Sequence, residues 1–208
     1  MEGYNIIKKF DTKRNKVFLA ERLGKKYIIK RYTSIGSLES EFKVLRALTG
    51  KANVPRAIHR LDNEIVMDYI PGDSLSTHYK QGTIFEMPSL AIQFAKFLKA
   101  FIAALPGYII NDINYRNYII NNGICYGLDF EFITEGTKER TTAEAVAFGL
   151  LVDGVTEEKK KSFLTKFMQE MGVQFSLIQD NILREITRRA RSLGIKVVAE
   201  EVIKALNS

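Results

Sequence analysis

The first third of the chain shows a pattern of hydrophobic and polar residues that is typical of a small β-sheet carrying one helix. Apolar residues, many of them β-branched or aromatic, alternate with polar ones in short runs, which is the period of a strand with one buried face. Five such runs predict strands at residues 4–10, 17–22, 27–32, 56–61 and 64–70. Between the third and the fourth, residues 37–49 carry apolar side chains at helical spacing and end at Gly50. We therefore predict an antiparallel five-stranded sheet with one helix.

Beyond residue 70 the pattern becomes mainly helical. Pro71-Gly72 breaks regular structure directly after the fifth predicted strand. Pro88 begins a strongly apolar helix that ends near Leu105, and Asn122-Gly123 predicts a hairpin of two short strands. Further helices are predicted at 142–152, 157–171, 176–193 and 196–206. The prediction is one α+β domain with two lobes, residues 1–70 and residues 71–208.

The composition fits a globular protein and excludes some kinds of site. Apolar residues make up 46% of the 208 residues, which is enough for a packed core. Cys125 is the single cysteine, so an internal disulfide and a cysteine-based zinc site are both excluded. His59 and His78 lie far apart in the sequence and lack paired ligands, so we expect no metal site built on imidazole.

The net charge and the length of the apolar runs limit the kinds of partner and the cellular location that we expect. A net charge of +7 favours an anionic partner, namely a nucleotide, a nucleic acid or an anionic surface. No uncharged apolar run reaches the roughly 18 residues of a membrane span. Lys8 and Lys9 stand where the apolar core of a signal peptide would lie. We therefore expect a cytoplasmic protein without a membrane span.

The most informative polar residues lie between positions 110 and 131. Asp112, in a predicted loop, is followed five positions later by Asn117, and the predicted hairpin then leads to Asp129. The hairpin would bring Asp129 back alongside Asn117. One carboxylate can orient an attacking hydroxyl, while an amide carbonyl and a second carboxylate are hard oxygen ligands for Mg²⁺. This spacing is typical of phosphoryl transfer from Mg-ATP.

A second pair of charged residues lies in the first part of the chain. Lys30 interrupts the apolar third strand, and Glu41 lies on or beside the buried stripe of the first helix. Because burying an unpaired carboxylate is costly, Glu41 needs a partner, and Lys30 is the obvious candidate. Such a pair would hold the ammonium ready for phosphate oxygens. The alternatives are a solvated lysine on the outer face of the sheet and a glutamate on the helix surface.

In chain order, these features resemble the protein-kinase-like fold. The strand lysine, the helix glutamate, the break at Pro71-Gly72 and the Asp112 to Asp129 region follow one another as they do there. The resemblance runs from about residue 4 to residue 131, and the helical remainder is similar to a reduced C-terminal lobe. It implies that residues 1–70 form a nucleotide-binding lobe and that ATP and Mg²⁺ are used to phosphorylate a hydroxyl.

The resemblance assigns nucleotide-binding roles by position. Lys30 would bind the α- and β-phosphates of ATP and pair with Glu41. Met67 would occupy the gatekeeper position, and the backbone of Asp68 and Ile70 would hydrogen-bond adenine.

It also assigns the residues of the transfer step. Asp112 would be the catalytic aspartate that orients the acceptor hydroxyl or accepts its proton. Asn117 and Asp129 would be the Mg²⁺ ligands.

The chain departs from eukaryotic protein kinases at several positions. Residues 11–16, expected to cover the phosphates, contain no glycine, although Lys13, Arg14 and Lys16 offer positive charge instead. Ile110-Asn111-Asp112 replaces the histidine-arginine-aspartate triplet, and Asp129-Phe130-Glu131 replaces Asp-Phe-Gly. These motifs are closer to the choline kinase and aminoglycoside phosphotransferase branch, whose acceptors are small molecules. The compact size instead resembles the RIO family, the lipopolysaccharide-core kinases and the kinase subunit of the tRNA threonylcarbamoyladenosine complex.

Three functions remain open from the sequence. The first is an active ATP-dependent kinase acting on a small molecule or a protein. The second is an ATP-binding pseudokinase or regulatory ATPase, which the glycine-free loop and the missing catalytic histidine favour. The third is an RNA-associated protein that uses a basic helix, for which a solvated helix face is the alternative. The arginines of that helix are Arg184, Arg188, Arg189 and Arg191.

Overall fold

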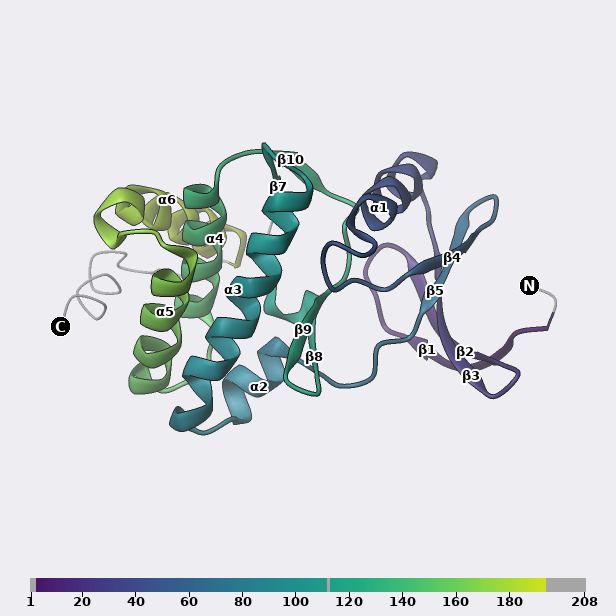
Figure 1. Cartoon of the computed structure of the whole chain (residues 1–208), viewed down its shortest axis with the longest axis horizontal. Helices are drawn as coiled ribbons and strands as arrows, with labels where there is room; N and C mark the ends of the chain where they lie inside the picture. The colour runs from purple at the N-terminus through teal and green to yellow at the C-terminus, as the bar shows by residue number, and fades with distance from the viewer. Residues whose placement is uncertain (1–2, 112, 194–208) are drawn as a thin grey trace.

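The protein consists of a sheet lobe and a helical lobe, which lie side by side along the long axis (Figure 1). The computed structural model describes residues 3–111 and 113–193. The predicted catalytic residue Asp112 and the predicted helix at 196–206 lie outside the described residues.

The sheet lobe is a five-stranded sheet covered by one helix. Its strand order is β1-β2-β3-β5-β4, and every neighbouring pair is antiparallel. Helix α1 (Ile35–Leu48) begins after Ser34, whose side chain accepts a hydrogen bond from the Ser37 N–H and caps the first turn. The predicted sheet with one helix is confirmed. The strands are β1 Asn5–Phe10, β2 Lys16–Arg22, β3 Lys25–Arg31, β4 Ala57–Arg60 and β5 Glu64–Asp68.

Alternation along β3 decides which side chains face the helix. Ile29 is fully buried in a small cluster with Ala20 and Val66. Its neighbours Ile28 and Lys30 point to the other face, where Ile28 packs against the main core and Lys30 meets α1. The predicted placement of Lys30 on the face of Ile28 is therefore confirmed, and the lysine is not solvated.

The helical lobe is built mainly from two helix pairs. Helix α3 packs on α5, and α4 packs on α6. Its helices are α2 Leu75–Gln81, α3 Met87–Ala104, α4 Lys138–Leu151, α5 Glu157–Met171 and α6 Phe175–Leu193, with 3₁₀ turns at Ile84–Glu86 and Tyr115–Asn117. Its short strands are β6 Asp73–Ser74, β7 Tyr108–Ile110, β8 Tyr118–Asn121, β9 Ile124–Gly127 and β10 Ile133–Glu135.

Several of these short elements are absent from the sequence-based prediction. Strand β7 directly precedes the predicted loop of Asp112, and its last residue, Ile110, pairs with Ile133 of β10. Helix α2 and strand β6 are also new. Each strand involved has only two or three residues, which is too short to show a period, and each is stabilised by a partner distant in sequence.

An aromatic cluster fills the centre of the helical lobe. Phe94 of α3 lies against Tyr115, with ring centroids 5.3 Å apart, and stacks on Phe167 of α5 at 5.1 Å. The Tyr115 hydroxyl donates a hydrogen bond to the Ala145 carbonyl at 2.9 Å, so the buried hydroxyl is satisfied. Because Tyr115 belongs to the turn after residue 112, the cluster anchors the predicted catalytic loop to α3, α4 and α5.

One helical stretch is long and apolar enough to cross a membrane. Among the residues that the structure describes, it is Ile84–Ala104, and 44% of its 18-residue apolar window is buried inside the protein. Phe94, Phe97 and Phe101 on this stretch belong to the core of the helical lobe. The core helix of a globular protein has the same length and composition.

Candidate nucleotide and metal site

The centre of the candidate site is the Lys30 ammonium, which contacts three carboxylates. Its Nζ lies 2.7 Å from Glu41 Oε2, 2.7 Å from Asp129 Oδ1 and 2.7 Å from Glu131 Oε1. Lys30 and Glu41 come from the sheet lobe, whereas Asp129 and Glu131 follow β9 of the helical lobe. The predicted pairing of Lys30 with Glu41 is present, and this cluster of charges joins the two lobes.

Burial and charge act in opposite directions on this cluster. Burial alone would lower the pKa of the Lys30 ammonium, but the carboxylates of Glu41, Asp129 and Glu131 outweigh it and raise the pKa above its ordinary value. The lysine is therefore charged at all physiological pH values. Burial raises the pKa of the Glu41 carboxyl, and Lys30 opposes that rise.

Glu41 is almost fully buried, at 1% exposure, and each of its oxygens has a donor. Oε2 accepts from Lys30 Nζ and from the Tyr32 hydroxyl, both at 2.7 Å. Oε1 accepts from the backbone N–H of Phe130 at 3.3 Å. Glu41 thus binds Lys30 through Oε2 and the Asp129-Phe130-Glu131 turn through Oε1.

The hairpin β8–β9 brings Asp129 into the site. The Leu128 N–H donates a hydrogen bond to the Asn117 carbonyl at 2.8 Å, so the residue before Asp129 lies directly beside Asn117. Asp129 itself has φ of +63°, a left-handed conformation that aspartate tolerates better than most residues. The expected juxtaposition of Asn117 and the Asp129 turn is therefore observed in the backbone.

A close backbone approach also positions this turn. Gly127 packs against the Phe97 ring so tightly that an added Cβ would overlap Phe97 Cζ. The Gly127 N–H donates to the Asn53 carbonyl at 3.0 Å, which ties the end of β9 to the segment between α1 and β4. A side chain at position 127 would displace the start of the Asp129 turn.

The donor set fits a hard divalent cation. Among the described residues, Glu41, Asp129 and Glu131 offer carboxylate oxygens that all lie within 4.8 Å of one another. Such oxygens are the ligands that Mg²⁺ prefers. Asp129, whose side chain is 46% exposed, is the most open of the three, whereas Glu41 and Glu131 are buried. The predicted ligand Asn117 is half-buried in the turn beside this cluster.

Two site residues have no assigned role in the sequence-based prediction. Asn15, in the glycine-free loop, is buried, and its Nδ2 donates a hydrogen bond to Glu131 Oε1. Its Oδ1 accepts from the Thr33 N–H at 3.3 Å. Glu131 is visible in the sequence as the last residue of the Asp-Phe-Glu motif, but no periodicity marks Asn15 as buried. A polar residue in a loop is ordinarily exposed, so the sequence holds no signal for it.

The predicted adenine-binding residues lie at the end of β5. Met67 is buried and pairs with Ile28 of β3 in register. The Asp68 N–H is already used, because it donates to the Arg56 carbonyl at 3.1 Å, which leaves only the Asp68 carbonyl for a base. Ile70 is half-buried just beyond the strand. These assignments remain predictions.

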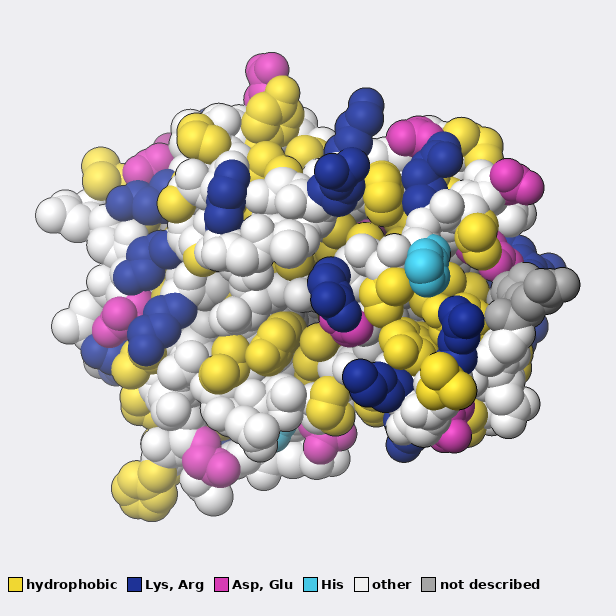
Figure 2. All heavy atoms as spheres, turned by 45° about the vertical axis from the view of Figure 1, so that its right-hand side comes forward, with side chains coloured by type: hydrophobic (Ala, Val, Ile, Leu, Met, Phe, Trp, Pro, Cys, Tyr) yellow, Lys and Arg dark blue, Asp and Glu magenta, His cyan; other side chains and the backbone are white. Residues whose placement is uncertain are grey.

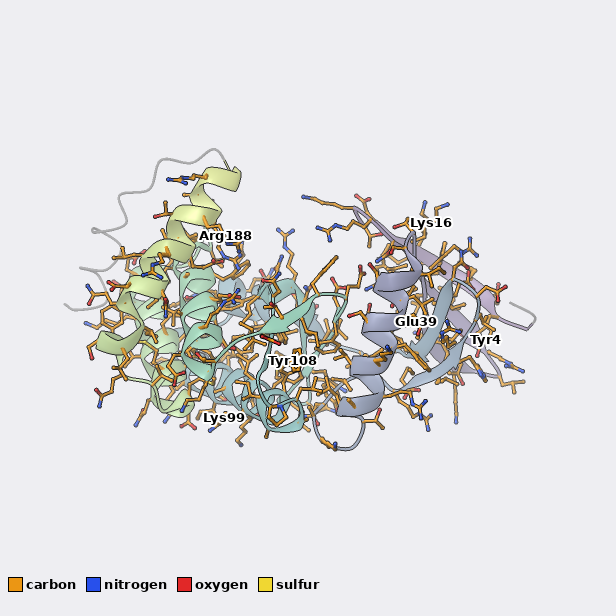
Figure 3. All side chains as sticks on the ribbon, turned by 90° about the horizontal axis from the view of Figure 1, so that it is seen from above. Tyr4, Lys16, Glu39, Lys99, Tyr108 and Arg188 are labelled. Carbon is orange, nitrogen blue, oxygen red and sulfur yellow. The ribbon has the colours of Figure 1, made fainter. Side chains whose placement is uncertain are left out.

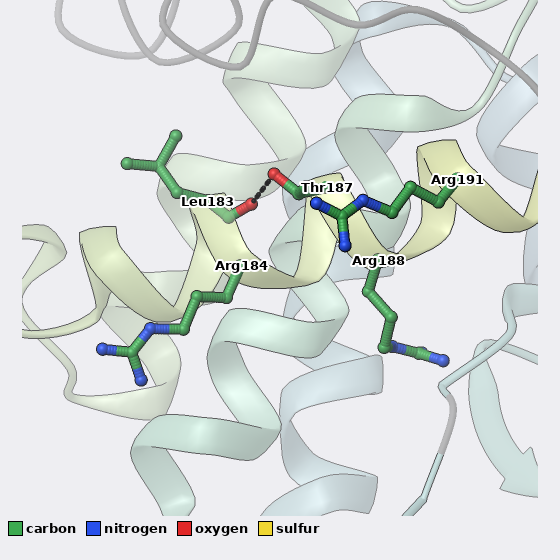
Figure 4. Close-up of a pocket in the computed structure, with 5 residues that line it drawn as sticks. All are labelled: Leu183, Arg184, Thr187, Arg188 and Arg191. Atoms are coloured by element: carbon green, nitrogen blue, oxygen red, sulfur yellow. Dashed lines mark hydrogen bonds between the residues drawn. The ribbon is translucent and has the colours of Figure 1, made fainter.

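The arginines of α6 differ in their surroundings. Figure 4 shows Arg184, Arg188 and Arg191 spread apart along the outside of the helix. Arg188 pairs with Glu185, with Nη2 2.6 Å from Oε1. The Arg189 side chain, by contrast, is only 11% exposed. The predicted use of this helix for RNA remains a prediction.

The rest of the surface does not single out a partner. On the face shown in Figure 2, Lys and Arg side chains are scattered among polar and hydrophobic ones. Figure 3 shows Lys16 of the sheet lobe and Arg188 of the helical lobe along the same edge of the molecule. Positive charge is thus present on both lobes without one dominant patch in these views.

The fold and the cluster around Lys30 define a protein with a protein-kinase-like fold. No protein-family model matches the chain, and no curated protein matches it in sequence. Among solved structures, the chain is similar to the Cydia pomonella granulovirus kinase PK-1, with a TM-score of 0.55 over 81% of this chain and 71% of that chain. The identity is 15%, so the similarity shows the fold alone.

Proposed function

We propose that this protein is an ATP- and Mg²⁺-dependent phosphotransferase that transfers the γ-phosphate to a hydroxyl group. The observation that carries the proposal is the Lys30 ammonium held between Glu41 of α1 and Asp129 of the helical lobe, at 2.7 Å from each. A buried lysine that is fixed at the junction of two lobes beside a set of hard oxygen ligands is suited to phosphate and metal together.

Different residues bind the phosphates, the adenine and the Mg²⁺ ion. Lys30 binds the α- and β-phosphates, and the carbonyl of Asp68 and the N–H of Ile70 bind adenine. Asn117 and Asp129 hold Mg²⁺, which neutralises phosphate charge when bound. The buried position of Glu41 keeps Lys30 oriented, since a free lysine would lose rotamer entropy on binding.

Asp112 is the proposed catalytic residue for transfer of the phosphate. Its carboxylate orients the acceptor hydroxyl and takes the proton as the new phosphorus–oxygen bond forms and the bond to ADP breaks. A positioned general base contributes about 10²–10⁴-fold to the rate. Lys30 stabilises the charge that develops on the phosphate oxygens.

The acceptor is the hydroxyl of a small molecule or of a protein. Helix α4 begins at Lys138, so only residues 132–137 separate it from Glu131, and three of them form β10. This segment is too short for a long regulatory loop, which favours an enzyme that is not switched on by phosphorylation there.

A mass-spectrometric search for phosphate transfer from Mg-ATP, including autophosphorylation and ADP release, tests the proposal. We expect Asp112→Asn to lose about 10²–10⁴-fold of the wild-type rate. Asp180→Asn, an exposed change on α6, is the matched control and retains the rate. Equal activity in Asp112→Asn and wild type would remove Asp112 from this role.

The glycine-free loop supports a second candidate, an ATP-binding pseudokinase. Asn15 of that loop donates a hydrogen bond to Glu131, and the guanidinium carbon of Arg14 lies 4.9 Å from the centroid of the Phe132 ring. These contacts fix the loop against the helical lobe. A thermal-shift titration separates the two functions. Stabilisation by Mg-ATP without phosphate transfer to any acceptor or to water supports the pseudokinase.

A further inference from the structure

Arg189 of α6 reaches across the helical lobe to the loop that follows Asp112. Its Nη2 donates a hydrogen bond to the Ile113 carbonyl at 3.1 Å, although the two residues are 76 positions apart. Ile113 is fully buried and comes directly after Asp112 in the sequence. The guanidinium therefore binds the backbone of the residue that follows the proposed catalytic aspartate.

The Arg189 side chain is held in one orientation by two further contacts. Its Nε lies 2.5 Å from Glu185 Oε1, one turn earlier on α6. Its guanidinium carbon lies 5.1 Å from the centroid of the Phe148 ring on α4, in a cation–π contact. A planar guanidinium that is held by a carboxylate and an aromatic face presents its other N–H groups in a fixed direction.

The carboxylate of Glu185 is shared by two arginines. Glu185 is buried, and burial would raise the pKa of its carboxyl, but Arg188 and Arg189 lower that pKa below its ordinary value. Glu185 is thus an ionised partner between the two arginines. Arg188, on the outer side, is mostly exposed, whereas Arg189 turns inward.

The loop has a second anchor two residues beyond Ile113. The Tyr115 hydroxyl donates to the Ala145 carbonyl of α4 at 2.9 Å. Both Ile113 and Tyr115 are therefore fixed to the α4–α6 pair.

We infer that Arg189 is a positioning residue that fixes the catalytic loop through the Ile113 carbonyl, with Glu185 and Phe148 orienting it. The expected effect on kcat rests on the proposed phosphotransferase function. The expected effect on the position of the loop rests on geometry alone. It assigns α6 a role in the site that is separate from any contact of its outer arginines with a partner.

The test compares Arg189→Ala, Arg189→Lys and wild type by steady-state Mg-ATP turnover and by hydrogen exchange of residues 110–117. We expect Arg189→Ala to lower kcat by about ten- to a hundredfold, since a small displacement of a reacting group has a cost of that order. The KM for ATP, whose proposed phosphate and adenine contacts lie in the sheet lobe, should change less than about twofold. Arg189→Lys keeps a donor and should recover part of kcat.

Arg184→Ala, on the outer side of the same helix, is the matched control and should match wild type in both measurements. If Arg189→Ala does not fold, as judged by circular dichroism, Arg189→Lys and Glu185→Gln take its place, because both keep side-chain volume and hydrogen-bonding capacity. A kcat and a loop exchange rate equal to wild type in Arg189→Ala, or in both replacement variants where Arg189→Ala does not fold, would overturn the inference, since Arg189→Lys should recover kcat only in part and Glu185→Gln removes the charge that orients Arg189.

The two proposals fail in different ways. Without any turnover in wild type, the phosphotransferase proposal fails, yet faster exchange of residues 110–117 in Arg189→Ala still supports the positioning role. With turnover in wild type and no effect of Arg189 on kcat or exchange, the positioning role fails alone.

Discussion

Asn15 Nδ2 donates a hydrogen bond to Glu131 Oε1, although 116 positions separate the two residues. Both side chains are buried, at 7% and 8% exposure, and Glu131 Oε1 also lies 2.7 Å from the Lys30 ammonium. One carboxylate oxygen thus joins the loop between β1 and β2, the central lysine and the turn after β9. A side-chain hydrogen bond thus fixes the position of this glycine-free loop.

Replacing Asn15 should loosen this loop. We expect Asn15→Ala to destabilise the protein by about 1–3 kcal/mol, because it leaves a buried hydrogen-bonding network short of a donor. Asn15→Asp should be worse, since it places a second carboxylate against Glu131. Chemical denaturation measures both changes, and the exposed loop change Lys13→Ala serves as the control with no effect. Equal stability of Asn15→Ala and Lys13→Ala would show that the bond contributes nothing.

Lys30 should be required for nucleotide binding more than for folding of the helical lobe. Lys30→Met keeps the length of the side chain but removes the charge shared by three carboxylates. We expect loss of Mg-ATP binding in isothermal titration, because the phosphates lose their cation and face uncompensated negative charge. Lys26→Met, on the same strand but exposed, should bind as wild type does. Unchanged affinity in Lys30→Met would contradict the assigned role.

Asp129→Asn should separate metal binding from stability. Asparagine tolerates the left-handed φ of +63° at this position and keeps a hydrogen-bonding oxygen for Lys30. We expect folding to be retained, while the Mg²⁺ concentration for half-maximal turnover rises by about tenfold or more, since one charged ligand is lost. A Mg²⁺ titration at saturating ATP makes the measurement. The exposed change Asp180→Asn should leave the Mg²⁺ dependence as it is.

Two glycine-to-alanine changes should have opposite signs. Gly127→Ala forces a Cβ into the Phe97 ring, and overpacking of this kind costs about 1–3 kcal/mol. Gly36 lies in α1, where an added Cβ would make only an ordinary contact with the Ser34 hydroxyl, so Gly36→Ala should stabilise the protein by about 0.5–1 kcal/mol. Thermal unfolding compares the two variants with wild type, and a stable Gly127→Ala would show that Phe97 moves aside without cost.

Glu144 should make stability depend on pH. Burial and the nearby Glu185 carboxylate raise the pKa of Glu144 above its ordinary value of 4.5, and its Oε2 has no partner among the described residues. For a carboxyl with a raised folded pKa, the protonated form favours folding. The contribution of Glu144 to stability is therefore greatest below pH 4.5 and declines as the pH rises through its folded pKa.

Glu144→Gln, which removes the ionisation, should be more stable than wild type at pH 8 and lose that advantage at pH 4. Urea unfolding at the two pH values measures the difference. Glu139→Gln, on the same helix but with a lowered pKa, should show the reverse trend. A pH-independent difference between Glu144→Gln and wild type would rule out the titration of Glu144 as the cause.

Local pattern is enough to predict the long elements. Alternation in β3 and the 3.6-residue spacing in α1 and α5 are properties of single segments, and they place Lys30 and Glu41 on facing surfaces. The helix at 157–171 has the predicted bounds, since Thr156 caps its start and Gly172 ends it in a left-handed conformation. The Asn122-Gly123 turn likewise predicts the hairpin that returns Asp129 to Asn117.

The order of the long elements and the β8–β9 hairpin can be read from the amino-acid sequence, because each depends on spacing within a segment or on a local turn. The sequence offers the Lys30–Glu41 pair as one of several alternatives, and the packing of α1 on the sheet decides it. Two contacts of the site cannot be read in this way: Asn15 meets Glu131, and Arg189 turns inward to Ile113 while Arg188 is mostly exposed. These contacts join residues 76 or more positions apart, and they form only when the lobes and helices pack together. No local period encodes such packing.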